Sequence, residues 1–543
     1  MLLLNTALRR RAVLAQVTTA AIASAAYNGA LTAPGDTDML RVMGKALQSA
    51  KTSHGIFAGQ APGLAPLFFT ELWERFSYYG MRALLTLFMV APIAGGGLGL
   101  ATADAARIYG NYTMAVYLLA IPGGFIADRL LGAKRAVLAG GWTIAIGHFA
   151  LAVPLIEFFF LGLVLISIGT GLFKPNISAL VGALYAPGDA RRDAGFSIFY
   201  MGINIGGLIA PIVTGFLAQS LWFKALLESN GFDPSKSWHW GFAAAGVGMT
   251  IAMLTFARTS EKLPDTDFGY DQSEGNASRS FWWQSAYVVI GTAAILVLAL
   301  ASDVPGWTWL RWFFLILPLA GIVYAARQPS EDAQRLAAIG LLFIAAMIFW
   351  AIFEQAGTTI ALFADQLTRT DIAGVPFPSA WFQSINPVFV ILLAPLFAAL
   401  WMRLGDRQPS SAVKFAIGLL CVSASFILMV PAATLAASGK VSPLWLIGLF
   451  ALQTSGELLL SPVGLSTMTK LAPARMTGLV LGLWFLAAAF GNKLAGVLGA
   501  GFSSSETATL AHAFLMQAIF VAIAAGLMFA AVPWFKRLSG GNR

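Results

Sequence analysis

Residues 66–90 read PLFFTELWERFSYYGMRALLTLFMV, a segment that is apolar and long enough to cross a bilayer, since a crossing takes roughly 20 mostly apolar residues. It nevertheless carries Glu71, Glu74, Arg75 and Arg82. On a helix that turns about 100° per residue, these four side chains and Tyr78 fall within a stripe about 100° wide. A charge at the bilayer centre costs at least ~2.5–3.5 kcal/mol, so the stripe must face protein or a water-filled cavity. The segment therefore predicts a polar path through a membrane.

An ion pair that merely fastens two helices together is the alternative explanation of these charges. Such a pair needs only one residue of each sign, whereas two acids, two bases and two tyrosines share this part of the segment. The excess of charge over what a fastening needs favours the functional interpretation.

The composition places the whole chain in the membrane class. Of 543 residues, 58% are hydrophobic and only 11% are charged, against about 25% charged in soluble proteins. The net charge of +9 does not indicate a nucleic-acid partner, because the basic residues are scattered through short loops. The single cysteine, Cys421, excludes a disulfide framework. The four histidines have no ligand spacing, so we expect neither a metal site nor a cofactor.

Apolar segments recur along the rest of the chain with short loops between them, about fourteen in all. We expect spans near 66–91, 105–127, 134–153, 156–183, 194–219, 239–257, 281–301, 307–326, 335–363, 379–402, 412–435, 443–467, 476–500 and 511–535. With the amino terminus inside, the inside loops hold most of the basic residues, among them Arg129, Arg191, Arg258, Arg335, Arg403, Arg475 and Arg543. The positive-inside rule therefore predicts cytoplasmic termini in the cell inner (plasma) membrane.

Residues 1–60 precede the first span. Their start, Arg9 to Arg11 followed by an apolar run, imitates a signal peptide, but Gln16 and Thr18 dilute the run and no soluble domain follows. We expect a poorly ordered cytoplasmic extension. An over-long start, with Met39 or Met43 as the true first residue, is the alternative.

The seventh and eighth spans, 281–301 and 307–326, differ from the others because their interiors hold no ionisable residue and a short SDVPG turn joins them. They fit a lipid-facing hairpin inserted between two bundles of six helices. The chain then divides into an N-terminal bundle at 61–257, a cytoplasmic linker with the two extra helices at 258–334, and a C-terminal bundle at 335–543. The expected fold class is an all-α polytopic membrane protein.

Beyond the first span, few charges lie deep in the membrane: Lys174, Glu354, Glu457 and Lys493. Counting about 1.5 Å per residue from the span ends, Lys174 matches Glu457 in the inner half. Arg82 matches Glu354 in the outer half by the same count. We therefore predict two gating salt bridges, one on each side of a central cavity, as alternating access requires. Structural fastening is the alternative for each pair.

Several polar and aromatic side chains fall well inside apolar spans: Tyr78, Tyr79, Tyr117, Asn204, Asn386 and Trp484. A single buried tyrosine or tryptophan is more often core than ligand contact. Asn204 and Asn386 are stronger candidates, because an amide in hydrocarbon needs partners. His148 is better explained as a packed core histidine than as a proton relay.

These motifs resemble a known group. The runs ELWERFSYYG (71–80), GGFIADRLLGAKR (123–135), GLFKPNIS (171–178) and FYMGINIGG (199–207) look like signatures of the proton-dependent oligopeptide transporters of the major facilitator superfamily. The EQ pair at 354–355, INP at 385–387, GELLLSPVGLS (456–466) and WFLAAAFGN (484–492) extend the resemblance through the second half. It covers about residues 66–500. Thr170 and Ala488 depart from the pattern, so contacts at those two points are in doubt.

The resemblance implies twelve core helices in two bundles with an extra hairpin, and inward symport of protons with di- and tripeptides. It implies that Glu71, Glu74, Arg75 and Glu354 couple protons. It assigns substrate binding to Arg75, Tyr78, Tyr79, Tyr117, Lys174, Asn204, Asn386, Glu457, Ser461 and Trp484. It assigns no catalytic residue and no metal ligand, and we expect a monomer with no obligate protein partner.

A physical mechanism fits these residues. A zwitterionic peptide presents a cation and an anion a fixed distance apart, which Glu457 on one side and Arg75 with Lys174 on the other can hold. When Arg75 moves toward the peptide carboxylate, it releases a glutamate of the first span to bind a proton. Because only the two ends are read, the side chains of the peptide can vary.

Rival functions remain open at this point. A proton symporter for a non-peptide solute, such as nitrate or an amino-acid conjugate, shares the scaffold, but the complete trio in the first span argues against it. Buried lysines and glutamates also occur in antiporter-like subunits of respiratory complexes, which would require partner subunits. A membrane enzyme is the weakest alternative, because no nucleophile–base pair or metal spacing is visible.

Overall fold

The computed structural model describes residues 56–186, 188–264, 277–327, 330–472 and 477–538. The chain divides into two compact units, Met1–Gln60 and Ala61–Arg543. The predicted extension falls outside the described residues up to residue 55. The middle of the predicted linker, 265–276, and the basic residues Arg475 and Arg543 fall outside them as well.

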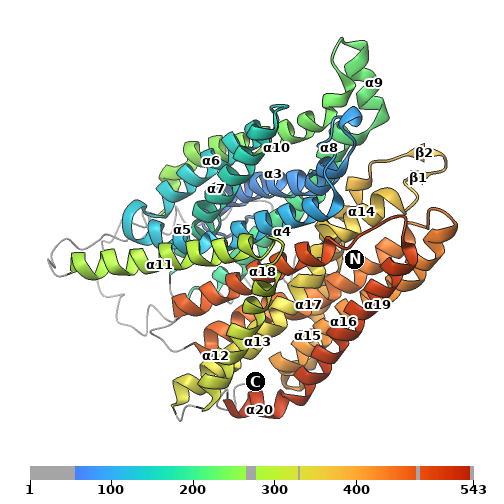
Figure 1. Ribbon diagram of the computed structural model, residues 1–543. Coiled ribbons are helices and arrows are strands. Elements are labelled where there is room, and N and C mark those ends of the chain that lie inside the picture. The colour runs from blue at the N-terminus through green and yellow to red at the C-terminus, as the bar shows by residue number, and fades with distance from the viewer. Residues whose placement is uncertain (1–55, 187, 265–276, 328–329, 473–476, 539–543) are drawn as a thin grey trace, which may run out of the picture. The chain divides into compact units, whose positions relative to one another are not determined.

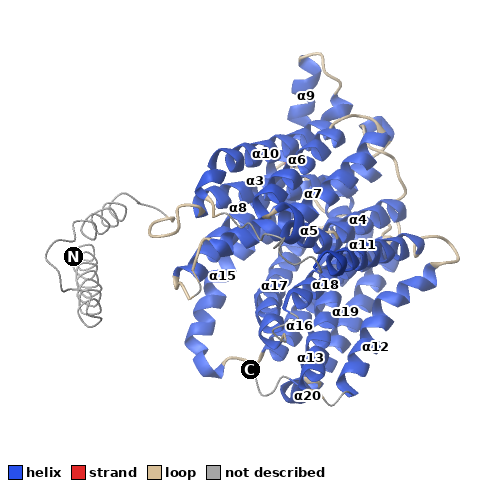
Figure 2. Cartoon of the chain, turned by 90° about the vertical axis from the view of Figure 1, so that its left-hand side faces the viewer, coloured by secondary structure: helices blue, strands red, loops and turns tan. Residues whose placement is uncertain are grey.

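The second unit is built from helices (Figures 1 and 2). They are α3 (Leu64–Val90), α4 (Thr102–Leu118), α5 (Ala120–Ile126), α6 (Ala133–Leu151), α7 (Ile156–Ala183), α8 (Arg191–Gln219), α9 (Leu221–Ser229), α10 (Ser237–Thr259), α11 (Ala277–Ala301), α12 (Phe313–Arg327), α13 (Glu331–Phe353), α14 (Thr359–Gln366), α15 (Ile385–Leu404), α16 (Ser411–Leu435), α17 (Leu444–Leu471), α18 (Thr477–Gly499), α19 (Thr507–Ala530) and α20 (Val532–Leu538). The strands among the described residues are β1 (Asp371–Ile372) and β2 (Val375–Pro376), which form a short antiparallel pair in the loop after α14.

Ten described helices are long and apolar enough to cross a membrane. They coincide with ten of the expected spans. The other four expected spans, 66–91, 134–153, 281–301 and 307–326, coincide with α3, α6, α11 and α12, which do not qualify by length and composition. α3 fails this criterion because of the charged residues of its stripe. Such residues can lie within a membrane where they line a polar path. The total of fourteen spans stays a prediction.

Several expected spans are interrupted rather than continuous; 105–127, for example, is divided between α4 and α5. The span 335–363 consists of α13 and α14 with a 3₁₀ turn at Glu354–Gly357 between them. The span 307–326 starts as a 3₁₀ turn, Thr308–Trp312, before α12. Apolarity alone cannot reveal such breaks, because a broken helix and a straight one need the same hydrophobic residues.

The helices pack in two sequence-local groups. α3 packs on α8 and α10, and α6 packs on α7 and α10. In the second half of the chain, α16 packs on α17 and α19, and α13 packs on α18. Figure 1 shows the blue-to-green helices gathered apart from the yellow-to-red ones. The two groups meet where α4 packs on α18 and α8 on α15.

Glycine residues allow some of these helices to approach one another closely. At Gly206 of α8, an added Cβ would lie 2.3 Å from the backbone oxygen of Leu72 in α3. Only glycine therefore permits this approach of α8 to the charged stripe. Small residues at helix interfaces are the usual device for packing in a membrane.

The distribution of polarity is inverted relative to a soluble protein. Large apolar side chains are exposed on the outer faces, for example Leu396 at 63%, Ile523 at 57% and Leu527 at 67%. Charged side chains lie inside, with Glu74 at 0% and Lys493 at 2% exposure. Lipid tails solvate the apolar surface, and the charges are hidden from them. The chain is an integral membrane protein.

Candidate functional site

The charged stripe of α3 faces the protein interior. Glu71, Glu74 and Arg75 are 3%, 0% and 4% exposed. Arg75 Nε lies 3.1 Å from Glu71 Oε1 and also donates to Glu74 Oε2. The Arg75 guanidinium lies 5.3 Å from the ring centroid of Tyr78, one turn further along the same helix. One cation therefore holds two carboxylates on a single helix.

This trio leaves polar capacity unused. Among the described residues, Glu71 Oε2, Glu74 Oε1 and Arg75 Nη2 are buried and have no hydrogen-bond partner. A buried charged group without partners carries a desolvation penalty of several kcal/mol. A proton on a carboxylate, or an anion beside the guanidinium, would remove part of that penalty. The trio can therefore take up a proton or an anion at atoms that have no hydrogen-bond partner among the described residues.

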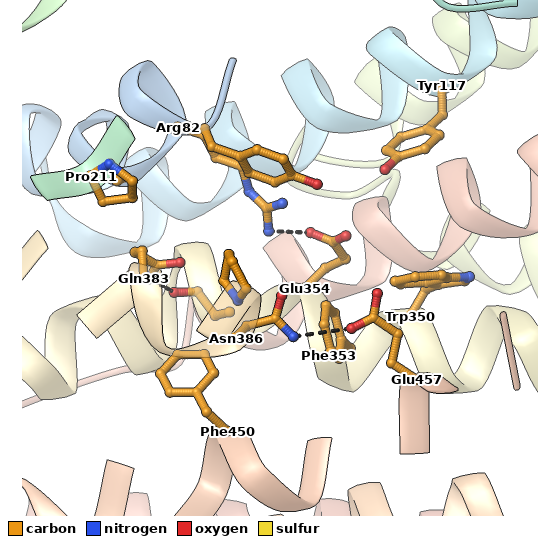
Figure 3. Close-up of a pocket in the computed structure, with 14 residues that line it drawn as sticks. Arg82, Tyr117, Pro211, Trp350, Phe353, Glu354, Gln383, Asn386, Phe450 and Glu457 are labelled. Atoms are coloured by element: carbon orange, nitrogen blue, oxygen red, sulfur yellow. Dashed lines mark hydrogen bonds and ion pairs between the residues drawn. The ribbon is translucent and has the colours of Figure 1, made fainter. Parts of the chain in front are cut away.

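A second charged contact joins the two halves of the chain. Arg82 of α3 forms an ion pair with Glu354, and its Nε donates to the hydroxyl of Tyr109 in α4 at 2.5 Å. Figure 3 shows the Arg82 and Glu354 side chains pointing at one another. Glu354 opens the 3₁₀ turn at which α13 ends, so the helix break positions its carboxylate.

A small cavity lies beside this pair. Six of the sequence-predicted residues line it: Tyr79, Arg82, Tyr117, Glu354, Asn386 and Glu457. The remaining wall is mostly apolar, from Ala83, Pro211, Trp350, Phe353, Ala356, Gln383, Pro387 and Phe450. Both halves of the chain contribute, so the cavity lies between them.

The acid on the second-half side of the cavity is held by an amide. Asn386 Nδ2 donates to Glu457 Oε2 at 3.0 Å and to Thr454 Oγ1 at 2.9 Å. Figure 3 shows this amide pointing at Glu457 from α15 toward α17. A hydrogen bond to a carboxylate orients the charged form. One carboxylate oxygen of Glu457 is therefore held in place by an amide of another helix.

Lys174 of α7 does not contact Glu457 in the described structure. Its Nζ lies 3.8 Å from the ring centroid of Tyr117 in α4, a cation–π distance. Among the described residues, Lys174 and Glu457 form no ion pair with each other. The inner salt bridge stays a prediction, and the structure shows the lysine turned to the aromatic wall instead.

Other predicted residues lie outside the cavity wall. Asn204 Nδ2 donates to the backbone oxygen of Tyr200, one turn back in its own helix, at 2.9 Å. Trp484 is 8% exposed and packs over Gly464 of α17, where an added Cβ would lie 2.4 Å from its ring. Tyr78 is buried against Tyr79, and Ser461 is half-buried in α17. These four side chains are not among those that line the cavity.

Sequence reasoning missed several members of the site. Tyr109 contacts Arg82, and Thr454 shares Asn386 with Glu457. Gln383 lies three residues before Asn386, on the same helical face, and donates to Ala356 O at 2.5 Å. That spacing was a usable signal. Thr454 offered the same signal, because it lies three residues before Glu457 in α17. Tyr109 offered none, because its partner Arg82 lies on another helix.

Two further predictions concern buried bases. Both ring nitrogens of His148 are buried and have no hydrogen-bond partner among the described residues. Lys493 contacts Asp303 and Asn111, which the sequence did not anticipate. Among the described residues, no group of three or more histidine, cysteine, aspartate or glutamate side chains is placed to hold a metal ion.

Comparison with known proteins agrees with this architecture. The model of the POT family matches residues 134–516. A protein named peptide transporter YePEPT, from Yersinia enterocolitica subsp. palearctica serotype O:3 (strain YE-P4), is 41% identical over 90% of this chain and 97% of its own length. A di-/tripeptide transporter of Lactococcus lactis subsp. cremoris is 39% identical over 81% of this chain and 89% of its own.

Solved structures are similar as well. A crystal structure of a peptide transporter POT in complex with sulfate aligns with a TM-score of 0.75 and 38% sequence identity, covering 91% of this chain and 99% of that one. The likeness extends over most of the length of each relative. The chain belongs to the POT family, the transporters that its own motifs resemble.

Proposed function

We propose that this protein is a proton-coupled symporter that imports di- and tripeptides by alternating access. The relatives that carry peptide-transporter names support this substrate class. The observation that carries the proposal is the charge layout of the site. An amide-held carboxylate, Glu457, stands on the second-half side, and the cations Arg75 and Lys174 stand on the first-half helices.

Such a layout binds a zwitterion by its two ends. The peptide carboxylate is received by Arg75, whose Nη2 has no partner among the described residues, and by Lys174 after it leaves the Tyr117 ring. The peptide ammonium is received by Glu457, with Asn386 and Asn204 supplying amide oxygens. Tyr78, Tyr79, Tyr117, Ser461 and Trp484 shape the space for side chains. Reading only the ends explains how one cavity accepts many sequences.

Proton coupling follows from competition for Arg75. In the described structure the Arg75 guanidinium forms ion pairs with both Glu71 and Glu74. When a peptide carboxylate draws Arg75 away, a buried carboxylate is left without its cation, and binding a proton removes the penalty of that isolated charge. The proton and the peptide therefore enter the site together. Glu354 is a second protonation site, because its proton would break the pair with Arg82.

The gates alternate between the two sides. Arg82 and Glu354 close the outer side, and Lys174 with Glu457 closes the inner side when they meet. Because the outer pair is joined and Lys174 lies against Tyr117, the proposed cycle assigns this conformation to its inward-facing state. Protonation of Glu354 would release the outer pair and allow return to the outward-facing state.

The proposed architecture is the major facilitator fold with about fourteen spans. Residues 61–257 and 335–543 form the two six-helix bundles, and 258–334 contain the linker and the inserted hairpin. The separate packing of α3, α6, α7, α8 and α10 from α13 and α16 to α19 supports this division. The protein resides in the cell inner membrane with both termini cytoplasmic, works as a monomer, and contacts lipid but no nucleic acid.

The decisive experiment is uptake by the purified chain in liposomes. Labelled dialanine should accumulate against its gradient when an acidic outside is imposed, and unlabelled dipeptides should compete. Nitrate and amino-acid conjugates serve as competitor controls for the non-peptide alternative. Competition by one of these, with none by dipeptides, would replace the peptide assignment. Failure of the acidic outside to raise accumulation would remove proton coupling.

A further inference from the structure

The inserted hairpin makes a charged contact with both halves of the chain. Asp303, in the turn after α11, lies 2.5 Å through Oδ2 from Lys493 Nζ of α18. The same oxygen accepts a hydrogen bond from Asn111 Nδ2 of α4 at 2.8 Å. Lys493 Nζ also donates to Asn111 Oδ1 at 2.7 Å. These three residues, here named the hairpin cluster, form a closed ring of contacts.

The cluster is buried and supported from its own loop. The side chains of Lys493 and Asp303 are 2% and 13% exposed. Arg311 Nε donates to the backbone oxygen of Ser302 at 3.1 Å, and its Nη2 lies 3.6 Å from Asp303 Oδ1. Arg311 therefore positions the Asp303 carboxylate independently of its contact with α18. The lysine, the carboxylate and the amide form a buried polar network, in which Asp303 Oδ1 has no hydrogen bond among the described residues.

The hairpin packs on both halves. α11 packs on α4 and α5, whereas α12 packs on α13, and Phe314 at the start of α12 stacks edge-on against Phe490 of α18 at 4.9 Å. Figure 2 shows α11 beside α4 and α18. The sequence predicted an accessory hairpin facing lipid. That expectation stays a prediction, and the structure adds that one helix packs on each half and that the turn reaches between them.

The cluster lies at the seam that must part for the cavity to open outward. Gly110 of α4 meets Gly496 of α18 so closely that an added Cβ would lie 2.8 Å from the Gly496 Cα. Tyr109 and Asn111 flank Gly110 and point about 200° apart around the helix. Tyr109 reaches the Arg82–Glu354 pair, and Asn111 reaches the hairpin. One stretch of α4 thus takes part in two closures, one on each face.

We propose that the hairpin cluster is a latch of the outer closure, which ties α4 to α18 through Asp303 and must release before the cavity opens outward. The latch rests on the proposed alternating-access cycle and adds the hairpin to it. A simple anchor would hold the hairpin to α18 in every state and leave the populations of those states unchanged. The two roles differ in what happens to outward exposure when the carboxylate is removed.

The experiment measures outward exposure directly. Cys421, the single native cysteine, is replaced by serine, and Ala83, which lines the cavity, is replaced by cysteine. The rate of labelling by a membrane-impermeant maleimide, added outside right-side-out vesicles, reports the outward-open population without requiring transport. Asp303→Asn should raise this rate about tenfold, which corresponds to about 1.4 kcal/mol.

A second variant covers failure of folding. Asp303→Asn leaves the buried ammonium of Lys493 without its counter-ion, which can destabilise the fold. The double variant Asp303→Asn with Lys493→Met therefore removes the positive charge as well. It should also raise the labelling rate, by less than the single variant. The matched control is Asp104→Asn, which breaks an exposed ion pair with Arg107 within α4 and should leave the rate unchanged.

The outcomes separate the latch from the proposed function. Labelling rates unchanged in both folded variants would overturn the latch, whether or not their thermal stability fell. Dialanine uptake by the chain with intact Asp303 is measured in parallel liposomes. Its absence would overturn the proposed function, while a rise in labelling would still show that the hairpin controls the outer side.

Discussion

At the scale of single residues, the site depends on charges whose partners can change. Arg75 holds two carboxylates at once, and each of the three side chains keeps one atom without a partner in the described structure. A rigid ion pair would fill its hydrogen-bonding capacity. The spare atoms are where a proton and a ligand carboxylate would enter, and the residue-scale predictions test that reading.

Removal of the Glu74 charge should separate proton drive from peptide movement. Glu74→Gln keeps the size of the side chain but cannot take up and release a proton. Uphill uptake under an acidic outside should fall to no accumulation above the external concentration, while peptide exchange across the liposome membrane persists. The wild-type reference gains ~1.4 kcal/mol per proton and pH unit. Undiminished uphill uptake would contradict the assignment of Glu74.

Asn386 should affect affinity for the peptide ammonium. Asn386→Leu removes the donor at 3.0 Å from Glu457, and hydrogen bonds to charged groups are worth about 1.5–3 kcal/mol. We expect KM for dialanine to rise about tenfold or more at 1.4 kcal/mol per decade, with a smaller change in maximal rate. Asn176→Leu is the control, because Asn176 is the more deeply buried of the two, at 2% exposure, and its described hydrogen bond goes to Leu172 O of its own helix. An equal rise in both variants would refute a specific role.

At the scale of elements, the two proposed closures depend on a helix break and on contacts between helices of the two halves. The turn Glu354–Gly357 interrupts the span formed by α13 and α14, and Gly357 admits the Tyr109 hydroxyl from α4. On the inner side, α7 and α17 carry the two charges whose meeting would close the path. Each closure therefore involves one element from each half.

Gly357→Ala should impair the outer closure. An added Cβ would lie 1.9 Å from Tyr109 Oη, and overpacking costs about 1–3 kcal/mol. Uptake should fall about tenfold, and outside labelling of a cysteine at Ala83 should rise. Gly482→Ala is the matched control, since a Cβ there meets nothing within 4 Å. Wild-type labelling in the Gly357 variant would show that the outer side closes without this contact.

The inner closure is tested by exchange of charges between α7 and α17. Lys174→Ala should abolish uptake, because both the peptide carboxylate and Glu457 lose their cation. The double variant Lys174→Glu with Glu457→Lys should restore more uptake than either single change. If the double variant takes up no more dialanine than the single variants, Lys174 and Glu457 do not form the proposed salt bridge.

At the scale of the whole molecule, proton symport with a neutral zwitterion moves net charge across the membrane. An inside-negative potential of 100 mV supplies ~2.3 kcal/mol per charge, which is about fortyfold accumulation for one proton at 1.4 kcal/mol per decade. Labelled dialanine should therefore accumulate in liposomes under a potassium diffusion potential with equal pH on both sides. Equal potassium on both sides is the control. Absence of potential-driven accumulation would exclude net charge transfer.

The sequence by itself determined the membrane class, the positions of most spans and the short list of buried charges. These follow from local pattern, because in lipid each helix must satisfy its own backbone hydrogen bonds and its apolar length is readable along the chain. The stripe of α3 was readable for the same reason, since its charges lie within three turns of one another. The motifs around Glu71 and Asn204 also sufficed to indicate the family.

Only the tertiary structure decided which distant side chains meet. Arg82 and Glu354 are 272 positions apart, and Lys493 meets Asp303 across 190 positions. No periodicity encodes such a pairing, because it depends on how helices from two halves pack at Gly110 and Gly496 and where a span breaks at Glu354. The hairpin cluster became visible only when the turn after α11 was placed between α4 and α18.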